Sequence, residues 1–288
     1  MIAITGAAGQ LGLALAEACQ ERGIACAALS RRELDITNAQ AVAAWFAAHS
    51  CECIINCAAY TAVDKAEDEP LASYAANALA PWLLARTKLP VVHVSTDYVF
   101  DGQARAPYET DAPARPASVY GLTKRAGETA LLENAGPGLI VRTAWVYSPR
   151  AGTKNFFNTM RRLFSSRESV SVVNDQRGAP TLAEDLAQTL LSLYEKGLHR
   201  EPMQVLHMTN AGEATWFEFA KAIKEGMHSA CRVLPISSAE YPTKAQRPAY
   251  SVLSLEKLKS FGISPRHWKE ALASALEAAA RRETRGSV

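Results

Sequence analysis

The sequence opens with Ile2-Ala-Ile-Thr-Gly-Ala-Ala-Gly-Gln-Leu-Gly12, in which a short apolar run passes into regularly spaced glycines, and continues as Leu13-Ala-Leu-Ala-Glu-Ala-Cys19. This order predicts a strand, a tight turn and a helix. Glycine suits positions where the turn is tight, where the backbone approaches a pyrophosphate and where the helix packs closely on its strand. A helix N-terminus also presents free N–H groups and a positive dipole end to phosphates. We therefore predict a dinucleotide site built on Gly6, Gly9 and Gly12.

The next apolar run, Gly23-Ile-Ala-Cys-Ala-Ala-Leu29, is the expected second strand, and Ser30-Arg31-Arg32 follows it. An acidic residue at this point binds the ribose 2′-hydroxyl of NAD, whereas an arginine can bind the 2′-phosphate of NADP. Arg31 and its neighbour therefore favour NADPH over NADH. Leu34-Asp35-Ile36 is placed for the adenine end of the cofactor, and Asp35 is equally readable as part of a helix-entry turn.

Three later runs are predicted to be buried parallel strands because they are nearly continuous in apolar residues: Cys53–Ala59, Val91–Val94 and Leu139–Thr143. Helical patterns over about 71–86 and about 120–133 lie between them. This alternation predicts an α/β fold whose residues 1–146 form a doubly wound parallel sheet of the Rossmann type.

The loop after Ala59 is polar and follows the carboxyl end of a strand, where open α/β sheets bind ligands. We interpret its acidic residues Glu67–Glu69 as a solvated face. From residue 147 onward the pattern is too irregular for another full α/β wrap. Residues 147–288 are therefore assigned mainly to a smaller carboxyl-terminal substrate lobe, with some elements returning to the main sheet.

Composition narrows the class of protein. The chain has 288 residues, of which 48% are hydrophobic and 21% charged, and its formal net charge of +2 provides no strong basic field for nucleic acid. No apolar segment approaches the roughly 18 residues of a membrane span, and no basic leader precedes the first strand. Six cysteines stand at irregular spacings without a C-x-x-C pair, so we expect reduced, packed thiols in a cytoplasmic protein.

The chemistry is predicted to lie between Ser95-Thr96, at the end of a strand, and Tyr120-Gly-Leu-Thr-Lys124, at the start of a helix. Residues four apart share one helix face. A tyrosine can protonate a carbonyl oxygen if a nearby lysine stabilises the phenolate, and lowering the tyrosine pKa from about 10 by about three units corresponds to roughly 4 kcal/mol. Thr96 can donate a hydrogen bond to the same carbonyl. Because no side chain supplies a hydride, a reduced nicotinamide must provide it.

Taken in order, these motifs resemble the extended short-chain dehydrogenase/reductase superfamily, which carries a carboxyl-terminal substrate lobe. The finer motifs resemble one family within it, the dTDP-4-dehydrorhamnose reductases. The matching stretches span almost the whole chain and are Ile4–Gly12, Leu34–Thr37, Asn56–Glu67, Ser95–Gly102, Val119–Lys124, Arg142–Tyr147, Asn155–Phe156, Asn174–Thr181 and Arg247–Ser251.

The resemblance implies NAD(P)H-dependent reduction of dTDP-4-dehydro-L-rhamnose to dTDP-L-rhamnose, a sugar donor for bacterial cell-surface polysaccharide. It implies Tyr120 as proton donor, Lys124 as its electrostatic partner and Thr96 as the carbonyl-binding hydroxyl. Thr96, Asp97 and Trp145 are implied to contact the sugar nucleotide. The cofactor residues that we expect are Gly6, Gly9, Gln10, Leu11, Gly12, Arg31, Asp35, Ile36, Ala59, Tyr60, Thr61, Val94, Tyr120 and Lys124.

Several of these residues also have plainer interpretations. Trp145 can fill the core, and Asp97 can anchor the turn that follows it. His93 is expected to be a structural histidine because it lies within a strand. Arg177 and Arg247 suit a substrate diphosphate, since guanidinium groups bind phosphate in a bidentate manner, but surface or interlobe ion pairs suit them equally.

Other functions remain open at this stage. The nearest keeps the fold and changes the substrate: another nucleotide-sugar 4-ketoreductase, an epimerase or a dehydratase. Dehydratases commonly carry Asp-Glu after the threonine, whereas Thr96 is followed by Asp97 and Tyr98. A non-catalytic NADP-binding regulatory subunit is a second alternative, which the intact Thr96, Tyr120 and Lys124 disfavour. The sequence leaves a homodimer open, and it offers no convincing ligand cluster for the Mg²⁺ associated with some family members.

Overall fold

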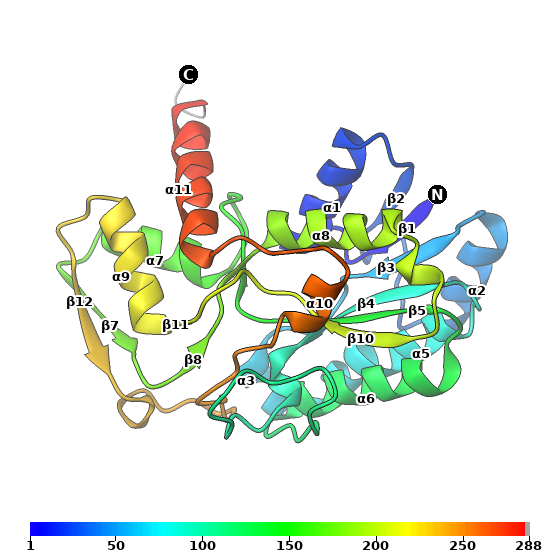
Figure 1. Ribbon diagram of the computed structural model, residues 1–288, viewed down its shortest axis with the longest axis horizontal. Helices are drawn as coiled ribbons and strands as arrows, with labels where there is room; N and C mark the ends of the chain where they lie inside the picture. The colour runs from blue at the N-terminus through cyan, green and yellow to red at the C-terminus, as the bar shows by residue number, and fades with distance from the viewer. Residues whose placement is uncertain (286–288) are drawn as a thin grey trace.

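The computed structural model describes residues 1–285, with side chains described as far as residue 282. Its centre is a six-stranded sheet in which every neighbouring pair is parallel, in the order β10-β5-β4-β3-β1-β2 (Figure 1). The chain steps outward from β1 in both directions, so the predicted doubly wound α/β fold is confirmed. The strands are β1 (Ile2–Thr5), β2 (Cys26–Leu29), β3 (Cys53–Asn56), β4 (Val91–Thr96), β5 (Gly138–Thr143) and β10 (Gln204–His207).

Helices cover both faces of this sheet (Figure 1). On one face α1 (Gln10–Glu21) packs beside α8 (Ala183–Glu195), and their apolar sides form one core cluster with the strands. On the other face lie α2 (Ala39–Ala48), α5 (Ala80–Ala85) and α6 (Val119–Asn134). Because both faces are covered, the central strands β1, β3 and β5 are buried along their whole length, which explains their continuous apolar sequences.

The helix predicted over residues 71–86 consists of three consecutive segments: α4 (Pro70–Tyr74), a π-helical turn (Ala75–Leu79) and α5. The π turn carries Asn77, whose side chain accepts a hydrogen bond from the backbone N–H of Tyr60 and donates one to its carbonyl. Such turns often occur at functional sites. Here the wider turn fixes the backbone of the polar loop that precedes α3 (Val63–Asp68).

A second lobe lies beside the sheet and has its own apolar cluster, which includes Phe157, Phe219 and Trp268 (Figure 1). Its main elements are α7 (Phe156–Phe164), β7 (Ser169–Val173), α9 (Trp216–Gly226), β12 (Arg232–Ile236) and α11 (Trp268–Arg285), with β7 parallel to β12. Short strand pairs join β6 (Val146–Tyr147) to β9 (Thr181–Leu182) and β8 (Arg177–Gly178) to β11 (Ala214–Thr215). Between these elements α8 and β10 return to the main sheet, and α10 (Glu256–Ser260) lies against β10.

Three further observations concern cysteines, membrane spans and metal sites. The six cysteines are all free thiols. Within residues 1–285 no helix combines the length and apolar character that a membrane crossing requires. The same described part of the chain holds no group of three or more histidine, cysteine or acidic side chains that could bind a metal ion.

Candidate active site

A cleft of about 1030 Å³ opens at the carboxyl ends of β1 to β5. It lies where the chain changes direction between β1 and β3, the position at which open α/β sheets bind nucleotides. The residues predicted to be catalytic, to line the cofactor or to contact the sugar nucleotide all line this cleft. The structure therefore brings these residues together in one cleft. The further candidates Arg32, Arg177 and Arg247 are not among its described lining residues.

The glycine turn after β1 has the tight geometry expected from the sequence. Gly6 has a positive φ of 71°, and a Cβ at this position would lie 2.5 Å from the backbone nitrogen of Ala58. A Cβ on Gly12 would lie 2.4 Å from the Gly6 carbonyl oxygen, so helix α1 can approach the turn only with glycine there. No side chain caps the α1 N-terminus, and its first turn carries no acidic residue. The Gly9 N–H donates to the Gly6 carbonyl at 3.0 Å. Gln10 and Leu11 line the cleft at the start of the helix, where backbone N–H groups have no partner within the helix.

In the segment that follows β2, Arg31, Asp35 and Ile36 line the cleft. The Asp35 carboxylate accepts hydrogen bonds from the Thr37 hydroxyl and backbone N–H, at 2.6 and 3.0 Å, and this lowers its pKa. Asp35 therefore holds the turn that leads to α2 and also faces the cleft. Arg31 is largely exposed and lies 3.4 Å from Asp35, which leaves its guanidinium group accessible at the rim.

The polar loop lines the middle of the cleft with Ala59, Tyr60 and Thr61. The hydroxyl of Tyr60 donates to Glu69 at 2.7 Å, and Glu69 itself lines the cleft. Glu67 accepts the backbone N–H of Val119 at 2.9 Å. The prediction of a purely solvated acidic face is therefore wrong for these two carboxylates, because one orients the loop and the other fixes the chain entering α6.

Tyr120 and Lys124 lie on the buried face of α6 and point into the same part of the cleft as Thr96. The helix starts at this point because Ser118 caps it, accepting the backbone N–H of Gly121 at 3.1 Å. Gly121 allows close packing, since a Cβ there would lie 2.2 Å from the Tyr98 carbonyl oxygen. The Thr96 hydroxyl donates to Asp97 at 3.0 Å and accepts the N–H of Tyr98, so its hydrogen is engaged by Asp97 in this structure.

The pKa of Tyr120 is shifted in the direction opposite to the one expected from the sequence. Burial raises the pKa of this phenol to about 12, and the nearby Thr96 hydroxyl only partly opposes the shift. The amine of Lys124 hydrogen-bonds instead to His93, at 3.1 Å, and to the Val94 carbonyl, at 2.7 Å. The sequence missed this arrangement, because a histidine within a strand gives no sign of which helix will pack over it.

Asp97 and Trp145, predicted to contact the sugar nucleotide, both line the cleft. Asp97 is 2% exposed, burial raises its pKa to about 6, and its Oδ2 atom has no hydrogen-bond partner. Trp145 has a positive φ of 49° and stacks on Trp216, with ring centroids 3.5 Å apart and an interplanar angle of 7°. A bulky residue seldom adopts this backbone conformation, so the surrounding structure must hold Trp145 in it. Trp216, at the start of α9, was not predicted from the sequence.

Comparison with known proteins agrees with this geometry. The family model of the RmlD substrate binding domain matches residues 1–281. The dTDP-4-dehydrorhamnose reductase of Mycolicibacterium smegmatis is 43% identical, over 96% of this chain and 85% of that protein. The chain belongs to the dTDP-4-dehydrorhamnose reductase family. It is therefore an oxidoreductase of the extended short-chain type.

Two further relatives of this reductase bear on cofactor and substrate. The dTDP-4-dehydrorhamnose reductase of Bacillus anthracis, solved in complex with NADP, superposes with a TM-score of 0.90 at 36% identity, covering 96% of this chain and 98% of that one. A probable dTDP-4,6-dihydroxy-2-methyloxan-3-one 4-ketoreductase of Streptomyces antibioticus is 43% identical, over 94% of this chain and 93% of that protein.

The two arginines considered for the substrate diphosphate form ion pairs in the reductase. Arg247 binds Asp64 of α3 at 2.6 Å and so joins the second lobe to the main domain. Arg177 lies 3.2 Å from Glu213. Neither arginine is among the described residues that line the cleft. The alternative interpretation therefore applies, in which Arg247 forms an interlobe ion pair and Arg177 a surface ion pair. A different cation, Lys154 in the loop before α7, does line the cleft.

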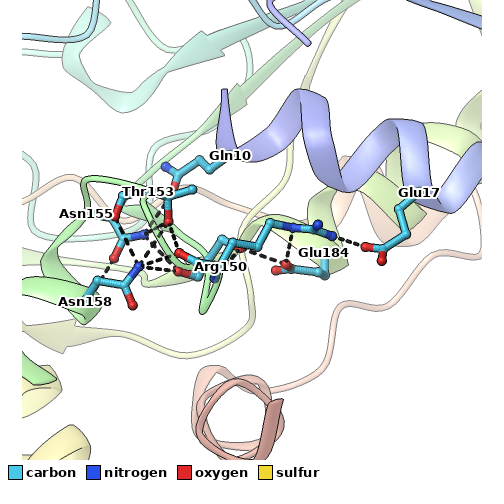
Figure 2. Close-up of polar contacts among 8 residues, drawn as sticks. Gln10, Glu17, Arg150, Thr153, Asn155, Asn158 and Glu184 are labelled. Atoms are coloured by element: carbon cyan, nitrogen blue, oxygen red, sulfur yellow. Dashed lines mark hydrogen bonds and ion pairs between the residues drawn. The ribbon is translucent and has the colours of Figure 1, made fainter. Parts of the chain in front are cut away.

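The loop before α7, which includes Arg150 and Asn155, forms polar contacts with the main domain on two sides (Figure 2). Arg150 points between Glu17 of α1 and Glu184 of α8 and forms ion pairs with both, at 3.3 Å in the case of Glu184. On the other side, Asn155 donates to the Gln10 side chain at 3.1 Å. The start of α1, next to the glycine turn, and the loop before α7 are therefore directly connected.

Replacing Arg150 by methionine should weaken this connection without removing any residue from the cleft. An ion pair of this partly buried kind contributes about 1 kcal/mol, so we expect the Kd for NADPH to rise by about fivefold. Fluorescence titration with NADPH measures the change. Arg200→Met is the matched control, because Arg200 pairs with Glu52 at 3.6 Å, before β3 at the amino edge of the sheet. An equal loss in both variants would contradict a specific role for Arg150.

Proposed function

We propose that this protein reduces the 4-keto group of dTDP-4-dehydro-L-rhamnose to give dTDP-L-rhamnose, with NADPH as the reductant and Tyr120 as the proton donor. The observation that carries the proposal is the meeting of Tyr120, Lys124 and Thr96 in one cleft with the glycine turn. The family relationship supports the reaction and the NADP-bound relative supports the cofactor. The product is a donor for bacterial cell-surface polysaccharide.

In the proposed reaction, Tyr120, Lys124 and Thr96 each have a role that is consistent with their surroundings. With a pKa of about 12, Tyr120 is a fully protonated phenol at neutral pH and so holds the proton that the keto oxygen needs. Lys124, one helical turn away, stabilises the phenolate that remains after transfer. Thr96 turns its hydrogen from Asp97 to the keto oxygen and holds the carbonyl in place. Bound NADPH supplies the hydride that reduces the carbonyl carbon.

The remainder of the cleft suits a dinucleotide and a sugar nucleotide. Free N–H groups at the α1 N-terminus suit the cofactor pyrophosphate, and Arg31 suits its 2′-phosphate. At the other end, the stacked Trp145 and Trp216 offer a flat apolar surface to the sugar or base. The unpartnered Oδ2 of Asp97 can accept a sugar hydroxyl. Lys154 places a positive charge where the cleft could hold the substrate diphosphate.

A second candidate function has specific support. The Streptomyces antibioticus relative is a probable ketoreductase of a different dTDP-sugar, and its identity to this chain equals that of the mycobacterial reductase. The reaction type is the same in both, so Thr96, Tyr120 and Lys124 serve either substrate. The choice between them depends on the sugar end of the cleft.

A direct assay distinguishes the two substrates. We expect the purified protein to oxidise NADPH with dTDP-4-dehydro-L-rhamnose, with a kcat/KM at least about tenfold higher than with dTDP-4,6-dihydroxy-2-methyloxan-3-one. The loss of NADPH absorbance measures turnover, and chromatography identifies the product. A reversed preference would move the assignment to the second ketosugar. Tight NADPH binding without turnover of either sugar would favour the regulatory alternative.

The same assay with NADH tests the cofactor assignment. Arg31→Ala should lower kcat/KM for NADPH by about tenfold and leave that for NADH nearly unchanged, because only NADPH carries the 2′-phosphate. The neighbouring Arg32 is exposed and does not line the cleft among the described residues, so Arg32→Ala is the matched control. Equal losses with both cofactors would show that Arg31 does not recognise the phosphate.

A further inference from the structure

A buried chain of polar side chains connects strand β1 to the catalytic helix. The Thr5 hydroxyl donates to Asn56 Oδ1 at 2.7 Å, and the backbone N–H of Ala58 donates to the same oxygen at 3.1 Å. Asn56 Nδ2 lies 2.9 Å from His93 Nδ1, and His93 Nε2 lies 3.1 Å from Lys124 Nζ. Asn56 and His93 are 0% exposed and Lys124 is 1% exposed, so this chain is shielded from solvent.

The backbone of Ala58 determines how this chain must be protonated. An amide N–H can only donate, so the Asn56 side chain must present its oxygen to Ala58 and its NH₂ group to His93. The Nδ1 atom of His93 is therefore an acceptor. Burial and the nearby Lys124 lower the pKa of His93, so its ring is neutral and carries a single hydrogen. That hydrogen must be on Nε2, the atom that faces Lys124.

This hydrogen on His93 Nε2 affects the protonation state of Lys124. An ammonium group has three N–H donors and no lone pair, so in its charged form it would face the His93 N–H with another donor. A neutral amine can accept that hydrogen while donating one of its own to the Val94 carbonyl, 2.7 Å away. The two contacts of Lys124 are therefore both satisfied only when the amine is neutral.

We propose that His93 is a positioning residue that presents its Nε2–H to Lys124, disfavours the ammonium form and thereby fixes the pH above which the site loses its cation. The histidine that the sequence suggested was structural thus acts on the reaction through Lys124.

The other groups facing Lys124 come from its own helix and from the segment after β3. On its own helix, Glu128 favours the ammonium form and Tyr120 lies one turn away. Cys57, which follows β3, also favours the charged form. Burial is the largest influence and lowers the pKa of Lys124 to about 8, against the opposing effects of Glu128 and Cys57. The cation is therefore present below about pH 8 and is lost as the pH rises through that value.

An NMR titration of the protein without ligands tests the proposal directly. Isotope label at lysine Cε reports protonation of each amine, and the signal absent from Lys124→Arg belongs to Lys124. In the wild type we expect its midpoint near pH 8. In His93→Gln the midpoint should rise by about one pH unit, because the glutamine carbonyl can accept from the ammonium group.

Two further variants make the result decisive. His93→Asn keeps an acceptor for Asn56 and removes the N–H that faces Lys124, so its midpoint should also rise. His199→Gln replaces another buried histidine, 1% exposed and stacked on Tyr194, and should leave the Lys124 midpoint unchanged. Thermal melting shows which variants are folded. A Lys124 midpoint that stays fixed or falls in the folded His93 variants would overturn the proposal.

The catalytic consequence rests on the proposed function, and kinetics separate the two ideas. For the wild type, kcat/KM for NADPH should decrease as the pH rises through about 8, and the His93→Gln profile should shift upward by the same amount as the NMR midpoint. If the NMR midpoint moves and the kinetic profile does not, His93 tunes Lys124 but the proposed part of Lys124 in the reaction is wrong.

Discussion

Replacement of Tyr120 by phenylalanine is expected to lower kcat by roughly 10²–10⁴-fold while leaving the Kd for NADPH within about twofold. The phenol is 9% exposed, and its ring packs edge-to-face on Tyr98 with centroids 5.4 Å apart. Phenylalanine preserves that packing and removes only the hydroxyl group, which is the proton donor in the proposed reaction. The measurement is single-turnover oxidation of NADPH with dTDP-4-dehydro-L-rhamnose, together with a separate binding titration.

A second Tyr→Phe substitution, away from the cleft, shows whether the loss of activity is specific to position 120. Tyr194 is another tyrosine with an engaged hydroxyl, which donates to the Glu52 carboxylate at 2.6 Å, at the amino edge of the sheet. Tyr194→Phe should therefore keep nearly full turnover. If Tyr120→Phe retained more than about a tenth of wild-type kcat, another group would have to supply the proton, since the expected loss from general-acid removal is larger.

The parts that sequence predicts well are those fixed by local pattern. The glycine spacing at Gly6 and Gly12, followed by a helix, predicts a close turn because no other residue fits, and the structure shows Cβ clashes at both positions. The apolar runs at β1, β3 and β5 predict a sheet covered on both faces, and every residue in them is buried. Strand ends then gather at one edge, so Thr96 and the Tyr60 loop come to share a cleft.

Contacts between distant segments could not be predicted in this way. His93 meets Lys124 only because β4 passes beneath α6, and Trp216 reaches Trp145 only through the packing of the second lobe on the cleft. The direction in which the pKa of Tyr120 shifts also could not be predicted from the sequence. Its direction depends on burial, which raises the pKa, and on the orientation of the Lys124 amine, which hydrogen-bonds elsewhere. A Tyr and Lys four residues apart give the shared helix face but not the state of either proton.

One such long-range contact supports the end of β4, the strand that carries Ser95 and Thr96. Glu128 on α6 is 0% exposed and forms a two-point ion pair with Arg142 of β5, at 2.9 and 2.8 Å. Its carboxylate also accepts the hydroxyl of Ser95, next to Thr96, at 2.6 Å. Burial disfavours the charged carboxylate, but Arg142 and Ser95 outweigh burial and hold the pKa of Glu128 below its usual range. The ion pair is therefore complete at neutral pH and is lost only as the pH falls through that lowered pKa.

Arg142→Met is accordingly expected to lower the free energy of unfolding by about 3–5 kcal/mol, because it leaves a buried carboxylate without its main partner. Urea unfolding of the purified variant measures the loss. The double variant Glu128→Leu/Arg142→Met removes both charges and should recover most of it, since an apolar pair of similar volume often replaces a buried ion pair at little cost. Arg142 also stacks over Phe100 at 5.1 Å, which methionine only partly replaces. If the double variant is as unstable as the single one, that packing, rather than the unpaired charge of Glu128, accounts for the loss.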